Sequence, residues 1–263
     1  MNRVKRLFKH LRSEERCGVV AYVTCGDPDV GTTPRIVEEL ERAGADAIEL
    51  GIPFSDPIAD GPVIQLASQR ALRSGTTIND LFAIARTIRE KSEIPLIAFS
   101  YLNPILRYGR ERFAIDASAA GIDGVLLTDL PPESADGTFK QHGLASIFLL
   151  APTSTDKRIA AIDRASDGFV YYVSTTGVTG ARSELDPYLL ERLTEIRAKL
   201  RNPIAVGFGI SRHEHYELLR DKCDAIVVGS AIVRAIGDGD AAGAPQRAAD
   251  VVHRILDNRP RAS

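Results

Sequence analysis

Three acidic residues lie close together in the stretch 49–62, Glu-Leu-Gly-Ile-Pro-Phe-Ser-Asp-Pro-Ile-Ala-Asp-Gly-Pro. Glu49 ends an apolar segment typical of a buried strand, where a carboxylate contributes nothing to packing. Asp56 and Asp60 lie in the loop that follows. Asp56 belongs to a Ser-Asp-Pro sequence, which is ordinary turn chemistry, so we expect it to be structural. Glu49 and Asp60 could instead face one another across a pocket, and we predict that this pair performs acid–base chemistry.

Three glycine-rich turns in the last third of the chain are suited to binding an anion. They are Gly177-Val-Thr-Gly180, Gly207-Phe-Gly-Ile-Ser211 and Gly229-Ser-Ala-Ile232. Glycine permits close approach of the backbone, and amides at a helix N-terminus together with a serine hydroxyl form a cradle for phosphate. The alternative is that these are three tight turns without a ligand. No lysine lies inside the motifs, so we expect backbone amides to hold most of the phosphate group.

These residues follow short apolar segments that alternate with helical patterns. The segments are rich in Val, Ile, Leu and aromatic residues and mostly lack polar alternation, as do strands buried on both faces of a parallel sheet. They cover residues 18–23, 46–50, 95–100, 124–128, 146–150, 168–174, 203–207 and 224–228. The helical patterns cover residues 33–43, 63–74, 78–91, 110–120, 134–142, 155–165, 187–200, 212–220 and 241–256.

This alternation predicts an α/β fold, a (β/α)8 TIM barrel that takes up residues 1–263 as a single domain. The length suits a barrel, which typically needs about 250 residues. In such a barrel the residues that follow each strand meet at one rim, where we expect the predicted acids and glycine-rich turns to lie. An open doubly wound sheet is the alternative, but no Gly-x-Gly-x-x-Gly follows the first strand. Residues 1–12 predict an extra amphipathic N-terminal helix packed on the barrel rather than a targeting peptide.

The composition excludes several classes of function. A net charge of -2 and a pI near 6.2 argue against a nucleic-acid or membrane-surface role. The three cysteines are an odd number without metal-like spacing, which indicates reduced thiols in a cytoplasmic protein. We see no metal cluster, no lysine placed for Schiff-base chemistry, and all five histidines in helical stretches. Carboxylate acid–base catalysis on a phosphorylated substrate remains.

The stretch 49–62 is similar to the signature of the tryptophan synthase alpha subunit family, as are Thr24-Cys-Gly-Asp-Pro28 and the turns at 177–180 and 207–211. The resemblance covers essentially the whole chain. It implies a carbon–carbon lyase of tryptophan biosynthesis that cleaves indole-3-glycerol phosphate to indole and glyceraldehyde 3-phosphate, a retro-aldol reaction. It also implies that this subunit has no cofactor of its own. Indole would pass to a beta subunit that carries pyridoxal phosphate, within an alpha2-beta2 heterotetramer.

The resemblance also implies roles for single residues. Glu49 matches the catalytic acid/base, Asp60 the partner of the indole nitrogen, and Tyr171 a tyrosine near the glutamate. Tyr171 and Tyr172 are adjacent on a strand, so only one of them can point into the barrel. The residues that match substrate or phosphate binders are Gly180, Phe208, Gly209, Gly229 and Ser230. Those that match the pocket or the coupling loops are Tyr22, which stands where phenylalanine is common, Tyr101, Asn103, Asp129 and Thr179.

The environments of the two acids predict different protonation states. Burial in an apolar barrel mouth should raise the pKa of Glu49, whereas Asp60 on its loop should stay ionised. Three alternatives stay open. Another phosphate-binding barrel, such as an epimerase, would share the glycine-rich turns but not the 49–62 motif. A stand-alone indole-releasing lyase and a non-catalytic regulatory subunit are the others.

Overall fold

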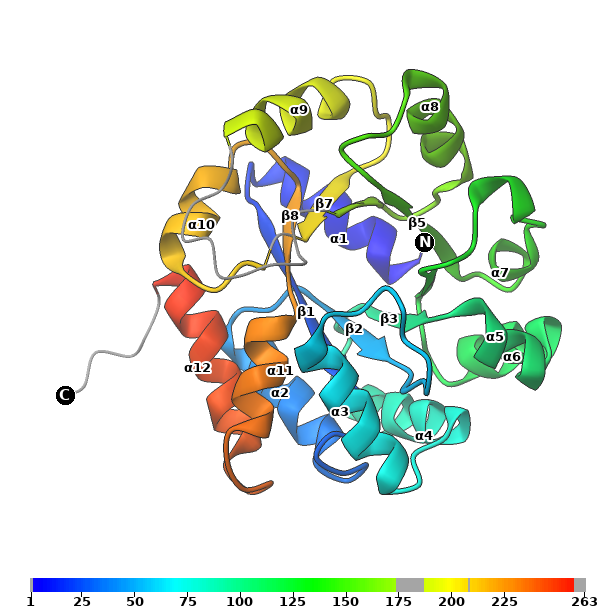
Figure 1. Ribbon diagram of the computed structural model, residues 1–263, viewed down its shortest axis with the longest axis vertical. Coiled ribbons are helices and arrows are strands. Elements are labelled where there is room, and N and C mark those ends of the chain that lie inside the picture. The colour runs from blue at the N-terminus through cyan, green and yellow to red at the C-terminus, as the bar shows by residue number, and fades with distance from the viewer. Residues whose placement is uncertain (1, 174–186, 208, 258–263) are drawn as a thin grey trace.

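The computed structural model describes residues 2–173, 187–207 and 209–257 and shows a closed barrel of eight parallel strands (Figure 1). Each strand pairs with the next along the chain, and β1 closes the barrel against β8. The predicted (β/α)8 fold is therefore confirmed. The strands are β1 Gly18–Thr24, β2 Ala47–Gly51, β3 Leu96–Ser100, β4 Gly124–Leu127, β5 Ala145–Leu150, β6 Val170–Val173, β7 Ile204–Gly207 and β8 Ala225–Val228.

Helices surround the barrel and cover the outward face of its strands (Figure 1). In α2, Thr33–Ala43, the apolar side chains of Ile36, Val37 and Leu40 recur at helical spacing and are buried, and Gly44 ends the helix in the left-handed conformation with φ of 110°. The other helices are α1 Arg3–Ser13, α3 Pro62–Arg73, α4 Ile78–Arg89, α5 Leu102–Tyr108, α6 Arg110–Ala119, α7 Thr138–Gln141, α8 Asp156–Ala165, α9 Pro187–Arg197, α10 His213–Leu219, α11 Ser230–Gly237 and α12 Ala244–Leu256.

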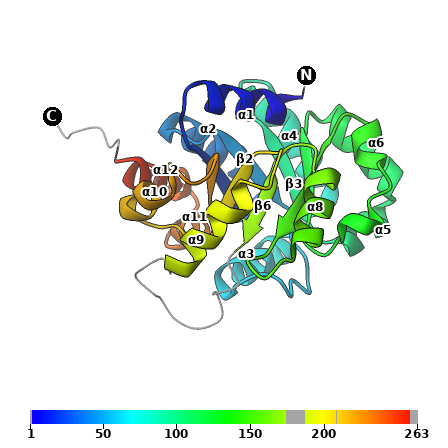
Figure 2. The ribbon, with the colours of Figure 1, turned by 90° about the horizontal axis from the view of Figure 1, so that it is seen from above.

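Helix α1 lies across the end of the barrel at which the strands begin (Figure 2). Its apolar face, formed by Val4, Phe8 and Leu11, is buried against inward-facing side chains of the strands. The rings of Phe8 and Phe169 are 5.1 Å apart. The predicted N-terminal helix is thus confirmed, and it closes the barrel floor, so that the other end remains for chemistry.

The structure departs from the predicted helices in three places. The helix predicted over 134–142 is present only as α7, because Gly137 takes the left-handed conformation just before it. No helix is predicted between residues 91 and 110, but α5 forms there after β3. The first N–H group of α5, that of Leu102, donates a hydrogen bond to the Asp129 carboxylate. The short helix α11 precedes α12, which begins at Ala244 rather than at residue 241.

The barrel interior is packed in two levels. A lower cluster of strand residues rests on α1, and an upper cluster joins Tyr22 of β1 to Ala67 of α3 and Val233 of α11. Phe99 contacts both clusters. The rim at the strand C-termini is therefore narrowed by two helices, α3 and α11. Of the helices that the structure describes, none is both long enough and apolar enough to span a membrane.

Candidate active site

The Glu49 side chain is enclosed inside the barrel. On β2 the alternation of side chains directs Ala47 and Glu49 inward and sends Ile48 and Leu50 to the helix layer. Glu49 has no exposed surface, and within the described part of the chain neither carboxyl oxygen has a hydrogen-bond partner. Burial raises its pKa to about 8. A carboxyl group in this setting is protonated near pH 7 and suited to donating a proton.

Asp60 lies two residues before α3, on a loop held by hydrogen bonds. Its backbone N–H donates to the carbonyl of Pro57 over 3.0 Å, and its carbonyl accepts from the Gln65 side chain over 2.9 Å. The Tyr101 hydroxyl accepts the N–H of Ala59 over 2.9 Å and hydrogen-bonds the Asp60 carboxylate. Burial raises the Asp60 pKa to about 6, and the bond from Tyr101 opposes the rise. The ionised form therefore still predominates near pH 7.

The pKa values of two tyrosines, Tyr22 and Tyr171, are affected by both of these acids. Burial, and then the charge of Asp60, raise the pKa of Tyr22 far above its usual range, and Glu49 contributes further. Burial, and then the charge of Glu49, raise the pKa of Tyr171 in the same way, with smaller effects from Tyr22 and Asp60. Both phenols are thus protonated, and each lies within electrostatic range of both carboxyl groups. These four side chains make up the candidate site.

Tyr171 faces the barrel interior and Tyr172 faces outward. Tyr171 contacts the interior cluster, whereas Tyr172 is fully buried in the layer between sheet and helices. Gly207, opposite on β7, makes room for the inward ring, since a Cβ atom there would lie 2.7 Å from the Tyr171 hydroxyl. A glycine that also belongs to an expected phosphate turn therefore shapes the pocket wall.

The glycine-rich turns after β7 and β8 meet at one cavity. Gly209, with φ of 63°, has a backbone conformation that favours glycine, and a Cβ atom there would have no neighbour within 4 Å. Helix α11 begins at Ser230, directly after Gly229. Gly209 and Ser230 line a cavity of about 550 Å³. This open space beside a helix N-terminus can hold an anion. Thr179, Gly180 and Phe208 lie outside the described residues.

Two of the residues predicted for the pocket or the coupling loops, Asp129 and Asn103, lie at α5. Asp129 accepts the N–H of Leu102 over 2.7 Å and thereby caps α5. Asn103 is exposed on α5. Tyr101 differs from both, because it is bonded to the loop that carries Asp60.

Sequence reasoning missed several residues at the two ends of the site. Ile64 of α3 lies 3.9 Å from where a Cβ atom at Gly229 would be, so α3 contributes to the wall beside Tyr22. Arg234 and Arg254 line the same cavity as Gly209 and Ser230. One signal was available, because Arg234 follows Ser230 by a single helical turn. Nothing in the sequence indicated Arg254.

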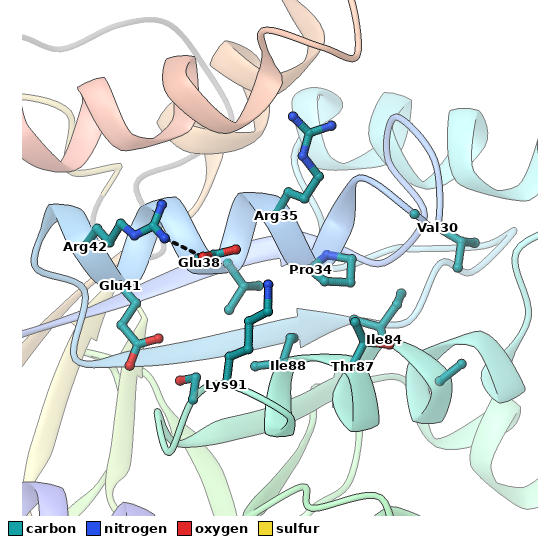
Figure 3. A pocket seen from close by; sticks show the side chains of 14 residues that line it. Val30, Pro34, Arg35, Glu38, Glu41, Arg42, Ile84, Thr87, Ile88 and Lys91 are labelled. Atoms are coloured by element: carbon teal, nitrogen blue, oxygen red, sulfur yellow. Dashed lines mark hydrogen bonds and ion pairs between the residues drawn. The ribbon is translucent and has the colours of Figure 1, made fainter.

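A separate groove lies outside the barrel, between α2 and α4 (Figure 3). It encloses about 430 Å³, with Val37, Ile84 and Ile88 among its apolar lining residues. Arg42 on its border pairs with Glu38. Its lining comes from residues 30–42 and 83–92, so it contains neither acid of the candidate site. Throughout the described residues, no group of three His, Cys, Asp or Glu side chains could hold a metal ion.

Comparison with known proteins identifies the family. The profile of the tryptophan synthase alpha chain matches residues 8–258. This chain belongs to the tryptophan synthase alpha chain family. It is 54% identical over 239 residues to the tryptophan synthase alpha chain of Solibacter usitatus, and 51% identical over 237 residues to that of Citrifermentans bemidjiense. These alignments cover 90% and 89% of both chains, respectively.

Solved tryptophan synthase structures match the same fold. The alpha subunit from Legionella pneumophila superposes with a TM-score of 0.90 at 36% identity, covering 98% of this chain and all of the other. A chain from the a2b2 complex of Pyrococcus furiosus superposes with a TM-score of 0.87 at 40% identity, covering 91% of this chain and 98% of that one. The (β/α)8 barrel is therefore the fold of this family, and the chain is a lyase of this family.

Proposed function

We propose that this chain cleaves indole-3-glycerol phosphate to indole and glyceraldehyde 3-phosphate, with Glu49 as proton donor and Asp60 as its ionised partner. The observation that carries the proposal is the Glu49 carboxyl group, fully buried without a hydrogen-bond partner among the described residues. Leaving such a group unbonded costs about 1–3 kcal/mol. A protein tolerates that cost where a substrate atom completes the site.

The chemistry requires the indole ring to lose its aromaticity for one step. Transfer of the Glu49 proton to ring carbon C3 makes that carbon tetrahedral and places positive charge on the ring nitrogen. Asp60, still ionised, accepts the indole N–H and stabilises the charge where it develops. The Glu49 carboxylate then takes the proton of the glycerol hydroxyl next to the breaking bond. The carbon–carbon bond electrons return to the ring, and indole and aldehyde separate.

Tyr171 and Tyr22 support this pair as neutral hydrogen-bond donors. Both have pKa values raised far above the usual range by burial, so neither ionises near neutral pH. Ionised phenols would instead add negative charge beside the carboxylates in a water-poor site. The electrostatic effect of Glu49 on Tyr171 supports a role for this tyrosine beside the proton donor, and Tyr22 lies next to the glycine turn, 3.6 Å from where a Cβ atom at Gly229 would be. The phosphate group binds at Gly209, Gly229 and Ser230, with Gly180, Thr179 and Phe208 completing the pocket.

We further propose that the chain works with a beta subunit in an alpha2-beta2 assembly, and that indole passes to pyridoxal phosphate there. The Pyrococcus furiosus relative forms an a2b2 complex with mutual activation. Ile58 is 88% exposed in the loop before Asp60, and Leu106 is exposed on α5. The bond from Ala59 to Tyr101 joins these two segments. A partner that covers the apolar side chains would thereby act on the Asp60 loop.

The beta-subunit surface is tested with Ile58→Asp. This change should weaken the complex at least about tenfold, because a buried unpaired charge is costly at an interface. Leu218→Asp, at an exposed apolar residue of α10, is the matched control. Equal affinities of both variants for the beta subunit in titration calorimetry would reject this surface.

We place the reaction in the cytoplasm and treat residues 1–263 as one barrel domain without a cofactor of its own. Cys17, Cys25 and Cys223 are buried free thiols, as suits a reducing compartment. The chemistry proposed above uses only side-chain acids and amides. A chain purified free of small molecules should therefore be fully active when the beta subunit is added.

The function is tested by incubating the chain with indole-3-glycerol phosphate, with and without a beta subunit. The wild type should release indole slowly alone and faster with the partner. Glu49→Gln should bind substrate but lose turnover by about three orders of magnitude or more. Glu90→Gln, at an exposed residue after α4, should behave as wild type. Substantial turnover by Glu49→Gln would refute the role of Glu49, and fast release without any partner would favour a stand-alone lyase.

A further inference from the structure

The cavity at the glycine-rich turns after β7 and β8 has several cationic residues in its lining. Gly209, Ser211 and Ser230 line it. Arg234 of α11, Arg254 of α12 and Arg212 beside α10 line it as well. A backbone cradle supplies dipoles but no net charge, whereas arginine side chains supply full positive charges.

Two of these arginines have no partner within the described residues. Arg234 and Arg254 are exposed, and no hydrogen bond or ion pair is formed by either one in this part of the chain. Arg212 differs, because its guanidinium lies 3.2 Å from the Nε2 atom of His215. Most arginines elsewhere in the barrel wall are paired, as Arg70 is with Asp27. The two unpaired charges are therefore available to an anion.

Among the described residues, only one acid lines this cavity. Asp238, just after α11, also acts electrostatically on Arg70, which lies on α3 and forms two hydrogen bonds with Asp27. Three arginines against a single shared carboxylate leave this lining net positive. A positive potential around an open cavity attracts anionic ligands and raises their local concentration.

The spacing of Ser230 and Arg234 on α11 brings a positive charge close to the proposed phosphate-binding turn. Arg234 follows Ser230 by four residues, so both side chains lie on the same face of the helix. Helix α12 packs against α11 and brings Arg254 into the lining of the same cavity. An anion bound at Ser230 would thus have the guanidinium group of Arg234 one helical turn away and that of Arg254 in the lining of the same cavity.

We propose that Arg234 and Arg254 form a second, charged layer of the phosphate site and bind the phosphate ester through its double negative charge. This inference rests on the proposed function for the identity of the substrate. A phosphate monoester carries close to two negative charges at neutral pH. Neutral amides and one hydroxyl group orient it, and the two arginines offset its charge. The site therefore selects a phosphorylated substrate over the dephosphorylated indole glycerol.

The test compares Arg234→Met, Arg254→Met and the double variant with wild type, in the presence of the beta subunit. Methionine keeps the aliphatic stem and removes the charge. The double variant should raise KM for indole-3-glycerol phosphate about tenfold, as expected for loss of charge-assisted bonds at an exposed site, with kcat within about twofold. The wild-type KM should rise with salt concentration and that of the variant should change less. Arg234→Lys should restore part of the affinity.

Two further measurements separate this inference from the proposed function. Arg86→Met removes an exposed arginine of α4 outside the cavity and should leave KM unchanged. Binding of inorganic phosphate to the chain, followed by calorimetry, should weaken in the double variant to about the same extent as KM rises. If wild type binds phosphate but never cleaves the substrate, the proposed function fails and this inference stands. If wild type cleaves the substrate and the double variant keeps its KM and phosphate affinity, the inference is wrong.

Discussion

The hydroxyl group of Tyr22 fills the space beside Gly51: a Cβ atom at position 51 would lie 2.1 Å from that oxygen and 2.6 Å from the ring carbon Cζ. Tyr22 pairs with Glu49 across β1 and β2, so its ring extends toward the rim over Gly51. The ring also packs edge-on against Phe99, with centroids 5.2 Å apart. The wall of the candidate active site next to Glu49 therefore depends on the lack of a side chain at Gly51.

Gly51→Ala should displace this ring. A methyl group at position 51 would overlap the Tyr22 ring, and Phe99 limits how far that ring can move. We therefore expect the free energy of unfolding to fall by about 1–3 kcal/mol and kcat to be lower. Gly31→Ala is the control, since a Cβ atom there would lie no closer than 3.4 Å to the Asp29 side chain. Denaturant unfolding and indole release measure both effects. Equal stability of the two variants would show that the ring moves at no cost.

Tyr101→Phe should alter the pH dependence of catalysis. The Tyr101 hydroxyl bonds the Asp60 carboxylate and holds its pKa lower than burial alone would. Without it, the Asp60 pKa should move upward from about 6, because a hydrogen bond to the charged form is lost. The acidic limb of kcat/KM should therefore shift to higher pH. Tyr108→Phe, which removes a hydroxyl bonded to Asp116, is the matched control; the same limb in both variants would contradict this role of Tyr101.

Gly209→Ala should weaken binding of the phosphate group. A side chain at this position is strained by the φ of 63° and enters the space assigned to the phosphate. Gly143→Ala controls for strain alone, because Gly143 has φ of 80°, also has no neighbour within 4 Å of a Cβ atom, and precedes β5 at the barrel floor. Both variants should lose similar stability, but only Gly209→Ala should raise KM. Equal KM values would remove Gly209 from the binding site.

Glu49→Gln should change the pH dependence of stability. The folded-state pKa of Glu49, about 8, lies above its ordinary value of 4.5, so its contribution to stability is complete below pH 4.5 and is lost as pH rises through 8. Relative to wild type, the variant should gain on the order of 4 kcal/mol between about pH 5 and pH 9. Urea unfolding at several pH values measures this. A constant difference between the two proteins would mean that Glu49 is already ionised in the fold.

Much of the fold follows from local sequence patterns. Apolar runs without polar alternation located the eight strands, and α2 has the predicted bounds because Gly44 ends it in the left-handed conformation. Helix α5, Leu102–Tyr108, was not predicted, because a helix of seven residues is too short to show a clear helical pattern. The residue that stabilises its start, Asp129, lies 27 positions away. Long-range capping cannot be seen in a local pattern.

Part of the candidate site could also be predicted from local sequence, and part of it depends on how distant segments pack together. Glu49 and Asp60 could be predicted because an acid at the end of an apolar strand is unusual, and the long motif is specific to the family. The bond between Tyr101 and Asp60 depends on how two loops meet at the rim. Arg254 lines the proposed phosphate cavity only because α12 packs on α11. The position of a charge such as that of Arg254, which depends on how two helices pack, cannot be predicted from the spacing of residues along the chain.

The central claim, that a neutral buried carboxyl group protonates the substrate, is tested most directly by titrating Glu49 itself. The chain is prepared with ¹³C-labelled glutamate, and the carboxyl resonance absent from Glu49→Gln is followed with pH. We predict a single residue titrating near the folded-state pKa of about 8, well apart from the other glutamates. A Glu49 resonance that titrates near its ordinary value of 4.5 would contradict the account, because the carboxylate would then have no proton to donate.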